Sequence, residues 1–414
     1  MPASLTELRQ QEYDLRLEIS RLTQALAAAD QGAVQALLDA LADQQAQLIL
    51  VEQQRVTLQA DNPQSGVLLD VRASAPAPVT RGGTTRGSAT TGLVATVRLK
   101  MAHVPTAIYH LLNNNEHPLI SGEVQNTSSK TRRIRVTSYI DGYTAHAIDT
   151  VEIEPGQTAI ITQLPTLFPE RIRGINELTR AMLNVLVEDL DGAVELHKTE
   201  PIWLLSRNSA PLYVRDPATD AWNDLTRYLG AFVTPNEPSI MQFLRKAAAR
   251  HPQKQLFGYQ ADRAVEPQVR AIFDALKADA DVTYVNSTIN FNPEQSARTQ
   301  RVRLPRQSLA EQQANCIDGV LLFASLLEAA SLNPALVIIP GHALVAWETG
   351  KQSGQWQYLE TTKLSEGTFD EACALGKQKA ATFEALATKS NSPMSFMRWS
   401  LRDLRTKHGI TPLE

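Results

Sequence analysis

The chain has 414 residues, of which 43% are hydrophobic and 20% are charged, and its formal net charge is -4. This length allows two or three domains with sizeable cores, and the slightly acidic balance gives no general attraction to nucleic acid or to an anionic membrane. Two cysteines, a polar N-terminus and no apolar run of membrane-spanning length indicate a cytoplasmic protein, with no membrane association and no disulfide framework.

Residues 1–60 carry a helical repeat. Apolar positions step alternately by three and four residues in two sets, and Gly32 permits a turn between them. The pattern predicts an N-terminal α-helical coiled-coil hairpin, which buries little surface alone. We therefore expect it to self-associate or to bind a protein partner, either as a plain structural pair or as an adaptor. The repeat consists of Leu5, Leu8, Glu12, Leu15, Ile19, Leu22 and Leu26, followed by Leu37, Leu41, Gln44, Leu48, Val51, Arg55 and Leu58.

Residues 61–92 are rich in Ala, Pro, Gly, Ser and Thr and are predicted to form a flexible linker. From residue 93 to residue 209 the sequence consists of short alternating runs separated by turn signals such as "EPG" and "DLDG". This pattern predicts a central all-β sandwich of immunoglobulin-like type, although it lacks the Cys…Trp…Cys spacing of antibody domains. No catalytic constellation is visible there, so we interpret it as a spacer or recognition module.

Residues 210–414 begin with helical patterns and continue with two apolar strands, "ALVIIPGHALVAWET" and "WQYLETT". Helices followed by consecutive antiparallel strands predict an α+β domain. Within it, Cys316 opens an amphipathic helix, where the unpaired N–H groups of the first turn stabilise a thiolate. His342 opens the first apolar strand and Glu360 ends the next one. If these strands form a hairpin, base and carboxylate can be neighbours, as a thiol nucleophile requires.

At these residues the sequence resembles the transglutaminase-like core of the papain-like cysteine hydrolase superfamily. The similarity covers residues 283–362 and is closest to bacterial transglutaminase-like domains, on "QRVRLP" at Gln300–Pro305, "CID" at Cys316–Asp318 and "GHA" at Gly341–Ala343. The resemblance implies a C-terminal α+β transglutaminase-like fold and a catalytic triad of Cys316, His342 and Glu360. Glu360 stands where the superfamily usually has Asp, and a longer side chain shifts the geometry.

The resemblance also implies a thioester acyl-enzyme formed on a protein substrate. The Cys316 N–H is one candidate oxyanion donor, and Gln300 is a second, in competition with Gln312 and Gln313. Three functions stay open: a cysteine peptidase or amidase, an inactive scaffold, and an acyltransferase that crosslinks proteins. Cys373 reads as structural and Asp318 as a stabiliser of the helix start. The sequence holds no phosphate loop, GxGxxG, HExxH or CxxC, so neither a cofactor nor a metal is predicted.

Overall fold

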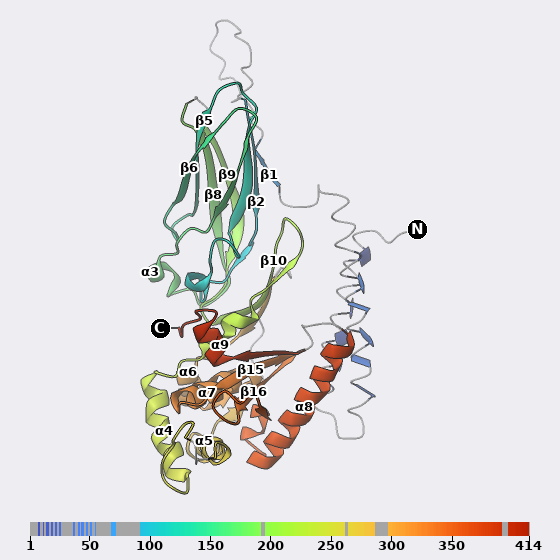
Figure 1. Ribbon diagram of the computed structural model, residues 1–414, viewed down its shortest axis with the longest axis vertical. Coiled ribbons are helices and arrows are strands. Elements are labelled where there is room, and N and C mark those ends of the chain that lie inside the picture. Colours follow the sequence, from blue (N-terminus) through green and yellow to red (C-terminus); the bar gives the residue numbers. More distant parts are fainter. Residues whose placement is uncertain are drawn as a thin grey trace, which may run out of the picture.

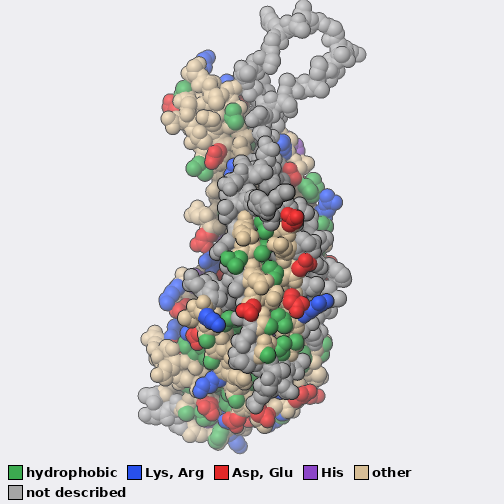
Figure 2. Space-filling model, turned by 90° about the vertical axis from the view of Figure 1, so that its right-hand side faces the viewer, with side chains coloured by type: hydrophobic (Ala, Val, Ile, Leu, Met, Phe, Trp, Pro, Cys, Tyr) green, Lys and Arg blue, Asp and Glu red, His purple; other side chains and the backbone are tan. Residues whose placement is uncertain are grey.

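The structure is a computed structural model that describes residues 92–191, 195–260, 264–285, 297–390 and 396–413, the strand at 68–71, and scattered positions between 7 and 54. Two β-sheets lie at one end of the molecule along its long axis, and the C-terminal helices and strands lie at the other end (Figure 1). Figure 2 shows the side that lies to the right in Figure 1. The acidic, basic and hydrophobic side chains drawn there are interspersed, in keeping with the small net charge.

Two sheets form the first end, and their buried residues belong to one continuous apolar core. Every strand pairing in them is antiparallel except that of β3 with β9. The first sheet has the order β1 (Leu68–Val71), β2 (Leu93–Leu99), β4 (Ile120–Asn126), β7 (Thr158–Gln163). The second has the order β3 (His103–Val104), β9 (Glu195–Leu204), β8 (Thr179–Asp189), β5 (Arg132–Ile140), β6 (Ala147–Ile153). Strand β1 lies within the segment expected to be a linker. The domain boundaries themselves stay predictions.

Short elements connect this end to the C-terminal part. A three-stranded sheet has the order β11 (Trp222–Asp224), β10 (Ser209–Arg215), β13 (Ala297–Arg301). Strand β12 (Thr283–Tyr284) pairs in parallel with β14 (Gln313–Ala314). From residue 92 onward, the helices among the described residues are η2 (Tyr109–Leu111), α3 (Pro169–Ile172), η3 (Thr226–Phe232), α4 (Pro238–Arg250), α5 (Glu266–Asp279), α6 (Pro305–Glu311), α7 (Cys316–Ala329), η4 (Thr361–Leu364), α8 (Phe369–Ser390) and α9 (Leu401–Thr406).

The C-terminal part is organised around an antiparallel sheet of order β17 (Trp356–Leu359), β16 (His342–Glu348), β15 (Pro334–Ile339), β18 (Met397–Ser400). Alternate residues of its central strands belong to different cores. Val345 and Trp347 lie in the core that also contains the buried face of α7, whereas Leu344 and Ala346 lie in a second core with Ala380 and Phe383 of α8. Because both faces of the sheet are covered, the sequences of these strands are almost continuously apolar.

The second core also includes part of the N-terminal segment. Leu41 is fully buried in it, and Ile19 and Leu22 pack against it. Figure 1 shows the described pieces of this segment beside α8. Residues predicted to form the coiled-coil seam therefore pack on the face of the C-terminal sheet that α8 also covers.

The expected fold class is consequently wrong. We expected an N-terminal coiled-coil hairpin, a central immunoglobulin-like sandwich and a C-terminal α+β transglutaminase-like domain. The described chain is instead mostly β, with short helices that lie mainly in its C-terminal part, and no long coiled-coil hairpin occurs among the described N-terminal positions. Apolar residues spaced by three and four mark any amphipathic helix, including one that docks on a sheet, so the repeat could not specify a coiled coil. Of its members, Leu5, Glu12, Leu26, Arg55 and Leu58 lie outside the described residues.

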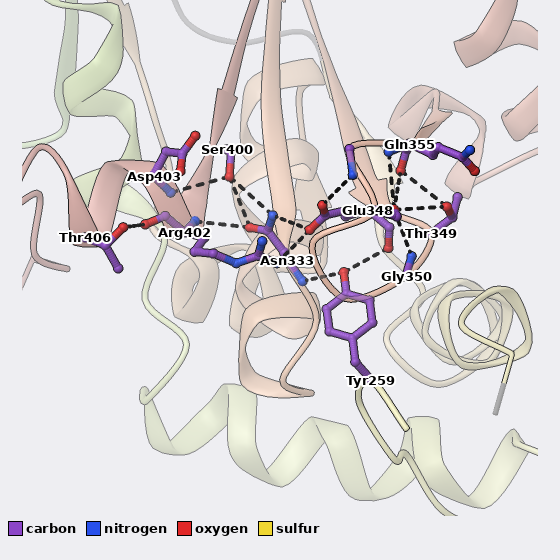
Figure 3. A network of polar contacts seen from close by, with 12 residues as sticks. Tyr259, Asn333, Glu348, Thr349, Gly350, Gln355, Ser400, Arg402, Asp403 and Thr406 are labelled. Atoms are coloured by element: carbon purple, nitrogen blue, oxygen red, sulfur yellow. Dashed lines mark hydrogen bonds and ion pairs between the residues drawn. The ribbon is translucent and has the colours of Figure 1, made fainter. Parts of the chain in front are cut away.

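A buried network of polar contacts surrounds Glu348, the last residue of β16 (Figure 3). Glu348 accepts hydrogen bonds from Arg402 at 2.6 Å, from Asn333 at 3.0 Å and from the Gly354 N–H at 2.9 Å. The Tyr259 hydroxyl donates to the Glu348 carbonyl at 2.8 Å. The network joins β16 to α9.

Arg402→Met is expected to lower the free energy of unfolding by about 2 kcal/mol, because it leaves the buried Glu348 carboxylate without its cation. Urea unfolding measures this change. The matched control is Lys407→Met, which removes an exposed i,i+4 pair with Asp403 and is expected to cost less than about 0.5 kcal/mol. Equal effects of the two substitutions would contradict a structural role of the network.

Candidate active site

Cys316 occupies the first position of α7. Asn315 precedes it as the N-cap, and its side-chain oxygen accepts a hydrogen bond from the Asp318 N–H at 2.8 Å. In return the Asp318 carboxylate accepts the Asn315 N–H at 3.2 Å, which completes a capping box. The Cys316 N–H lies in the first turn, where no carbonyl of the helix can accept it. The cysteine is partly exposed, so its thiol can meet a substrate at the positive end of the helix.

A buried ion pair fixes the start of this helix. Asp318 is fully buried, and it accepts the Arg303 backbone N–H at 2.8 Å and the Arg303 guanidinium at 3.0 Å. Burial raises the pKa of Asp318, and the bonds from Arg303 and Asn315 oppose that rise. The contact explains physically why "QRVRLP" accompanies "CID" in the sequence: Arg303 supplies the cation that Asp318 needs. Asp318 acts on the helix, as its early-turn position predicted.

His342 at the start of β16 and Glu360 directly after β17 are neighbours. The two-residue turn Pro340–Gly341 joins β15 to β16, and Gly341 adopts a φ of 68°, a conformation that favours glycine. His342 is the first residue of β16, and β17 pairs beside that strand and ends directly before Glu360. The His342 Nε2 atom lies 2.7 Å from Glu360 Oε2. The carboxylate therefore contacts Nε2, not the Nδ1 atom that a simple triad analogy suggests.

His342 also interacts with the Cys316 thiol. Nδ1 is the ring nitrogen available for that interaction, because Nε2 is engaged by Glu360. Burial lowers the pKa of His342, but the interaction with Cys316, the hydrogen bond to Glu360 and the charge of Glu360 outweigh burial and raise that pKa to about 9, against a smaller opposing effect of Lys379. An imidazolium is thus favoured at neutral pH.

Glu360 stays ionised although it is fully buried. Burial raises its pKa, but the hydrogen bond and charge of His342 and the charge and hydrogen bond of Lys379 hold the pKa far below its usual value. Its second oxygen accepts the Thr362 N–H at 3.2 Å and the Thr362 hydroxyl at 2.9 Å. Both carboxylate oxygens are occupied, which fixes the orientation of the carboxylate toward His342.

Direct contact between α7 and η4 sets the spacing of the site. The Thr361 hydroxyl, adjacent to Glu360, donates to the Cys316 carbonyl at 3.3 Å. A Cβ on Gly319 would lie 2.9 Å from the Thr361 hydroxyl oxygen, so only glycine lets the two elements approach this closely. The start of the cysteine helix and the end of the carboxylate strand are thereby held together.

Two residues near the site escaped the sequence reasoning. Lys379 of α8 donates to Glu360 Oε2 at 2.8 Å. Tyr284 of β12 is 41% exposed; burial of its ring raises its pKa, and the charges of Cys316 and Glu360 raise it further. The parallel pairing of Tyr284 with Ala314 puts it beside the approach to Cys316. Neither residue belongs to a recognisable motif, and only the charge of Lys379 offered a signal.

The side-chain amides of the three glutamine candidates for the oxyanion site are hydrogen-bonded to other groups. Gln300 is on β13, where its amide donates to the Arg301 carbonyl at 3.3 Å. Gln312 donates to the Ala280 carbonyl at 3.0 Å, and Gln313 donates to Glu311 at 3.1 Å. None of these described hydrogen bonds is made to Cys316, and the Cys316 N–H, in the first turn of α7, stays a candidate donor, as does Gln300.

Cys373 differs from Cys316 in its surroundings. It lies on α8 and packs against the main core, and burial with the charges of Glu266 and Asp370 raises the pKa of its thiol to about 12. A thiol with that pKa is a poor nucleophile at neutral pH.

Among the residues that the structure describes, no group of three or more His, Cys, Asp or Glu side chains is arranged to hold a metal ion. Within that same part of the chain, no helix has the length and apolar character needed to cross a membrane.

No protein-family model matches the sequence, and no match was found among curated proteins. Among solved structures, a FixG-related protein from Vibrio parahaemolyticus is similar with 9% identity and a TM-score of 0.20, over 27% of this chain and 94% of that one. Native alpha-2-macroglobulin from Escherichia coli, spanning domain MG7 to the C-terminus, is similar with 11% identity and a TM-score of 0.20, over 46% of this chain and 34% of that one. Similarities this weak carry no argument about the site.

Proposed function

We propose that this protein is a cysteine hydrolase, a peptidase or an amidase, that acts on a protein substrate through Cys316, His342 and Glu360. One observation carries the proposal: His342, whose Nε2 atom lies 2.7 Å from the buried Glu360 carboxylate, interacts with the thiol of a partly exposed cysteine at a helix start. Thiol catalysis needs a nucleophile beside a base, and a third group that orients the base. Cys316, His342 and Glu360 are arranged in that order.

The mechanism follows from the charges. His342 holds the proton as an imidazolium, and the Cys316 thiolate attacks an amide carbonyl carbon. The tetrahedral oxyanion is met by the Cys316 N–H at the positive end of α7. The C–N bond breaks as His342 Nδ1 gives its proton to the leaving amine. Water then attacks the carbonyl carbon of the thioester while His342 takes one of its protons. The C–S bond breaks, a carboxylic acid is released, and the Cys316 thiolate and the His342 imidazolium are restored.

We further propose a relationship to the transglutaminase-like cysteine hydrolases. It is supported by the order of a helix-start cysteine, a strand-start histidine and a carboxylate after the next strand. We also propose a cytoplasmic location. Support for it comes from the cysteines, since both Cys316 and Cys373 are free thiols, which a reducing compartment maintains.

The test is incubation of the full chain with unfolded, reduced casein and a dansylated primary amine, followed by mass spectrometry. We expect new peptide termini or conversion of Gln to Glu, and their loss in Cys316→Ala. Cys373→Ala is the matched control and is expected to retain the activity, because that thiol is kept protonated. Incorporation of the amine in place of water would identify an acyltransferase. Products that persist in Cys316→Ala would contradict the proposed nucleophile.

A further inference from the structure

Lys379 shares one oxygen of Glu360 with His342. Its Nζ atom lies 2.8 Å from Glu360 Oε2, and His342 Nε2 lies 2.7 Å from the same atom. The lysine side chain is 18% exposed and the glutamate side chain is fully buried. An ammonium group is thus held against the carboxylate that orients the histidine.

The backbone around Lys379 is fixed to the strand that carries Glu360. A Cβ on Gly376, one turn earlier on α8, would lie 2.7 Å from the Leu359 backbone nitrogen. The Glu360 N–H donates to the Ala372 carbonyl at 3.0 Å. The backbones of α8 and of the end of β17 are therefore in direct contact, which places the aliphatic part of the Lys379 side chain beside the Glu360 carboxylate. The next residue, Ala380, is buried in the second core and anchors the helix on its other side.

We propose that Lys379 is a positioning residue of the site, which holds Glu360 in place against His342 and limits the share of the carboxylate charge that acts on the imidazole. This inference rests on the proposed function. The lysine does not contact the reacting atoms. It acts through Glu360, and its positive charge opposes the effect of Glu360 on the proton of His342.

The direction of the effect follows from the groups that face the pair. His342 faces Cys316 from α7, Glu360 from the end of β17 and, through Glu360, Lys379 from α8. Tyr284 of β12 is neutral at physiological pH and feels the charges of Cys316 and Glu360. Glu360 raises the pKa of His342 and Lys379 lowers it. Without the lysine charge, His342 holds its proton to higher pH and becomes a slower proton donor.

The experiment is an NMR titration of the His342 ring in Cys316→Ala, alone and combined with Lys379→Met, with His342→Ala used for assignment. We expect the His342 pKa to rise by about one unit when Lys379 is replaced by Met. Lys379→Arg, which keeps the charge, is expected to restore the original value. Because the nucleophile is absent from every sample, the shift is measurable whether or not Cys316 proves to be catalytic, so the two proposals can fail separately.

Two controls keep the result decisive. Lys377→Met removes an exposed lysine from the same helix and is expected to leave the His342 pKa unchanged. Lys379→Gln removes the charge but keeps a hydrogen-bond donor, and it is read in place of Lys379→Met if the latter does not fold. An unchanged His342 pKa in a folded Met or Gln variant would overturn the inference, as would an equal shift in Lys377→Met.

Discussion

Alkylation of Cys316 by iodoacetamide at pH 6 is expected to slow by about a hundredfold when His342 is replaced by alanine. In the wild type, His342 has a pKa raised to about 9, so the imidazolium is favoured at neutral pH and is lost as the pH rises through 9. A cation beside a thiol favours the reactive thiolate form. Without His342 that cation is absent, so we expect less of the reactive thiolate at pH 6.

The measurement is the alkylation rate between pH 5 and 10 on a Cys373→Ala background. The wild-type site is expected to react almost uniformly from pH 6 to 8, whereas His342→Ala is expected to gain reactivity steadily with pH. His408→Ala is the control, because His408 is exposed and its described ring contact is with Trp399. If the His342→Ala and parent profiles coincide, Cys316 and His342 do not form a catalytic dyad.

The second large effect is expected at Glu360. Glu360→Gln is expected to reduce the rate of casein hydrolysis by up to about 10⁴-fold, the loss seen when the carboxylate of a catalytic triad is neutralised. Loss of the carboxylate removes a hydrogen bond and a charge that raise the pKa of His342, so the imidazolium is also expected to titrate at lower pH. The rate and its pH profile, measured together, check both parts.

Lys379 complicates this substitution, because it would face an amide in place of its anion. The double variant Glu360→Gln/Lys379→Met removes both charges and is expected to recover stability without recovering activity. Glu366→Gln, an exposed neighbour, is expected to behave as the wild type. Recovery of hydrolysis in the double variant would mean that the uncompensated lysine, not the missing carboxylate, caused the loss.

Local features of the C-terminal part could be predicted from the sequence. A helix beginning at Cys316 could be expected because Asn315 is a good N-cap and Asp318 suits the first turn. The apolar strands on either side of Gly341 could be expected from their composition, and they pair as β15 and β16. These features depend on neighbours in the sequence, so local rules suffice to describe them.

Long-range contacts could not be predicted in the same way. The spacing of Ile19, Leu22 and Leu41 identifies an apolar face but not the surface that it covers, and we assigned that face to a coiled coil. The contact of Lys379 with Glu360 depends on the close approach of α8 to β17, which no spacing encodes. For the same reason, only the structure identifies Nε2 as the ring nitrogen of His342 that contacts Glu360.

The burial of Leu41 among residues of β15, β16 and α8 has a consequence for biosynthesis. Its partners Ala335, Leu344 and Phe383 are synthesised about 290 or more residues later, so Leu41 emerges from the ribosome long before its binding surface exists. Closing so long a loop is slow compared with local folding, which makes this contact one of the last to form. Until then the nascent chain carries the apolar side chains of Ile19, Leu22 and Leu41 without the surface that covers them in the folded protein.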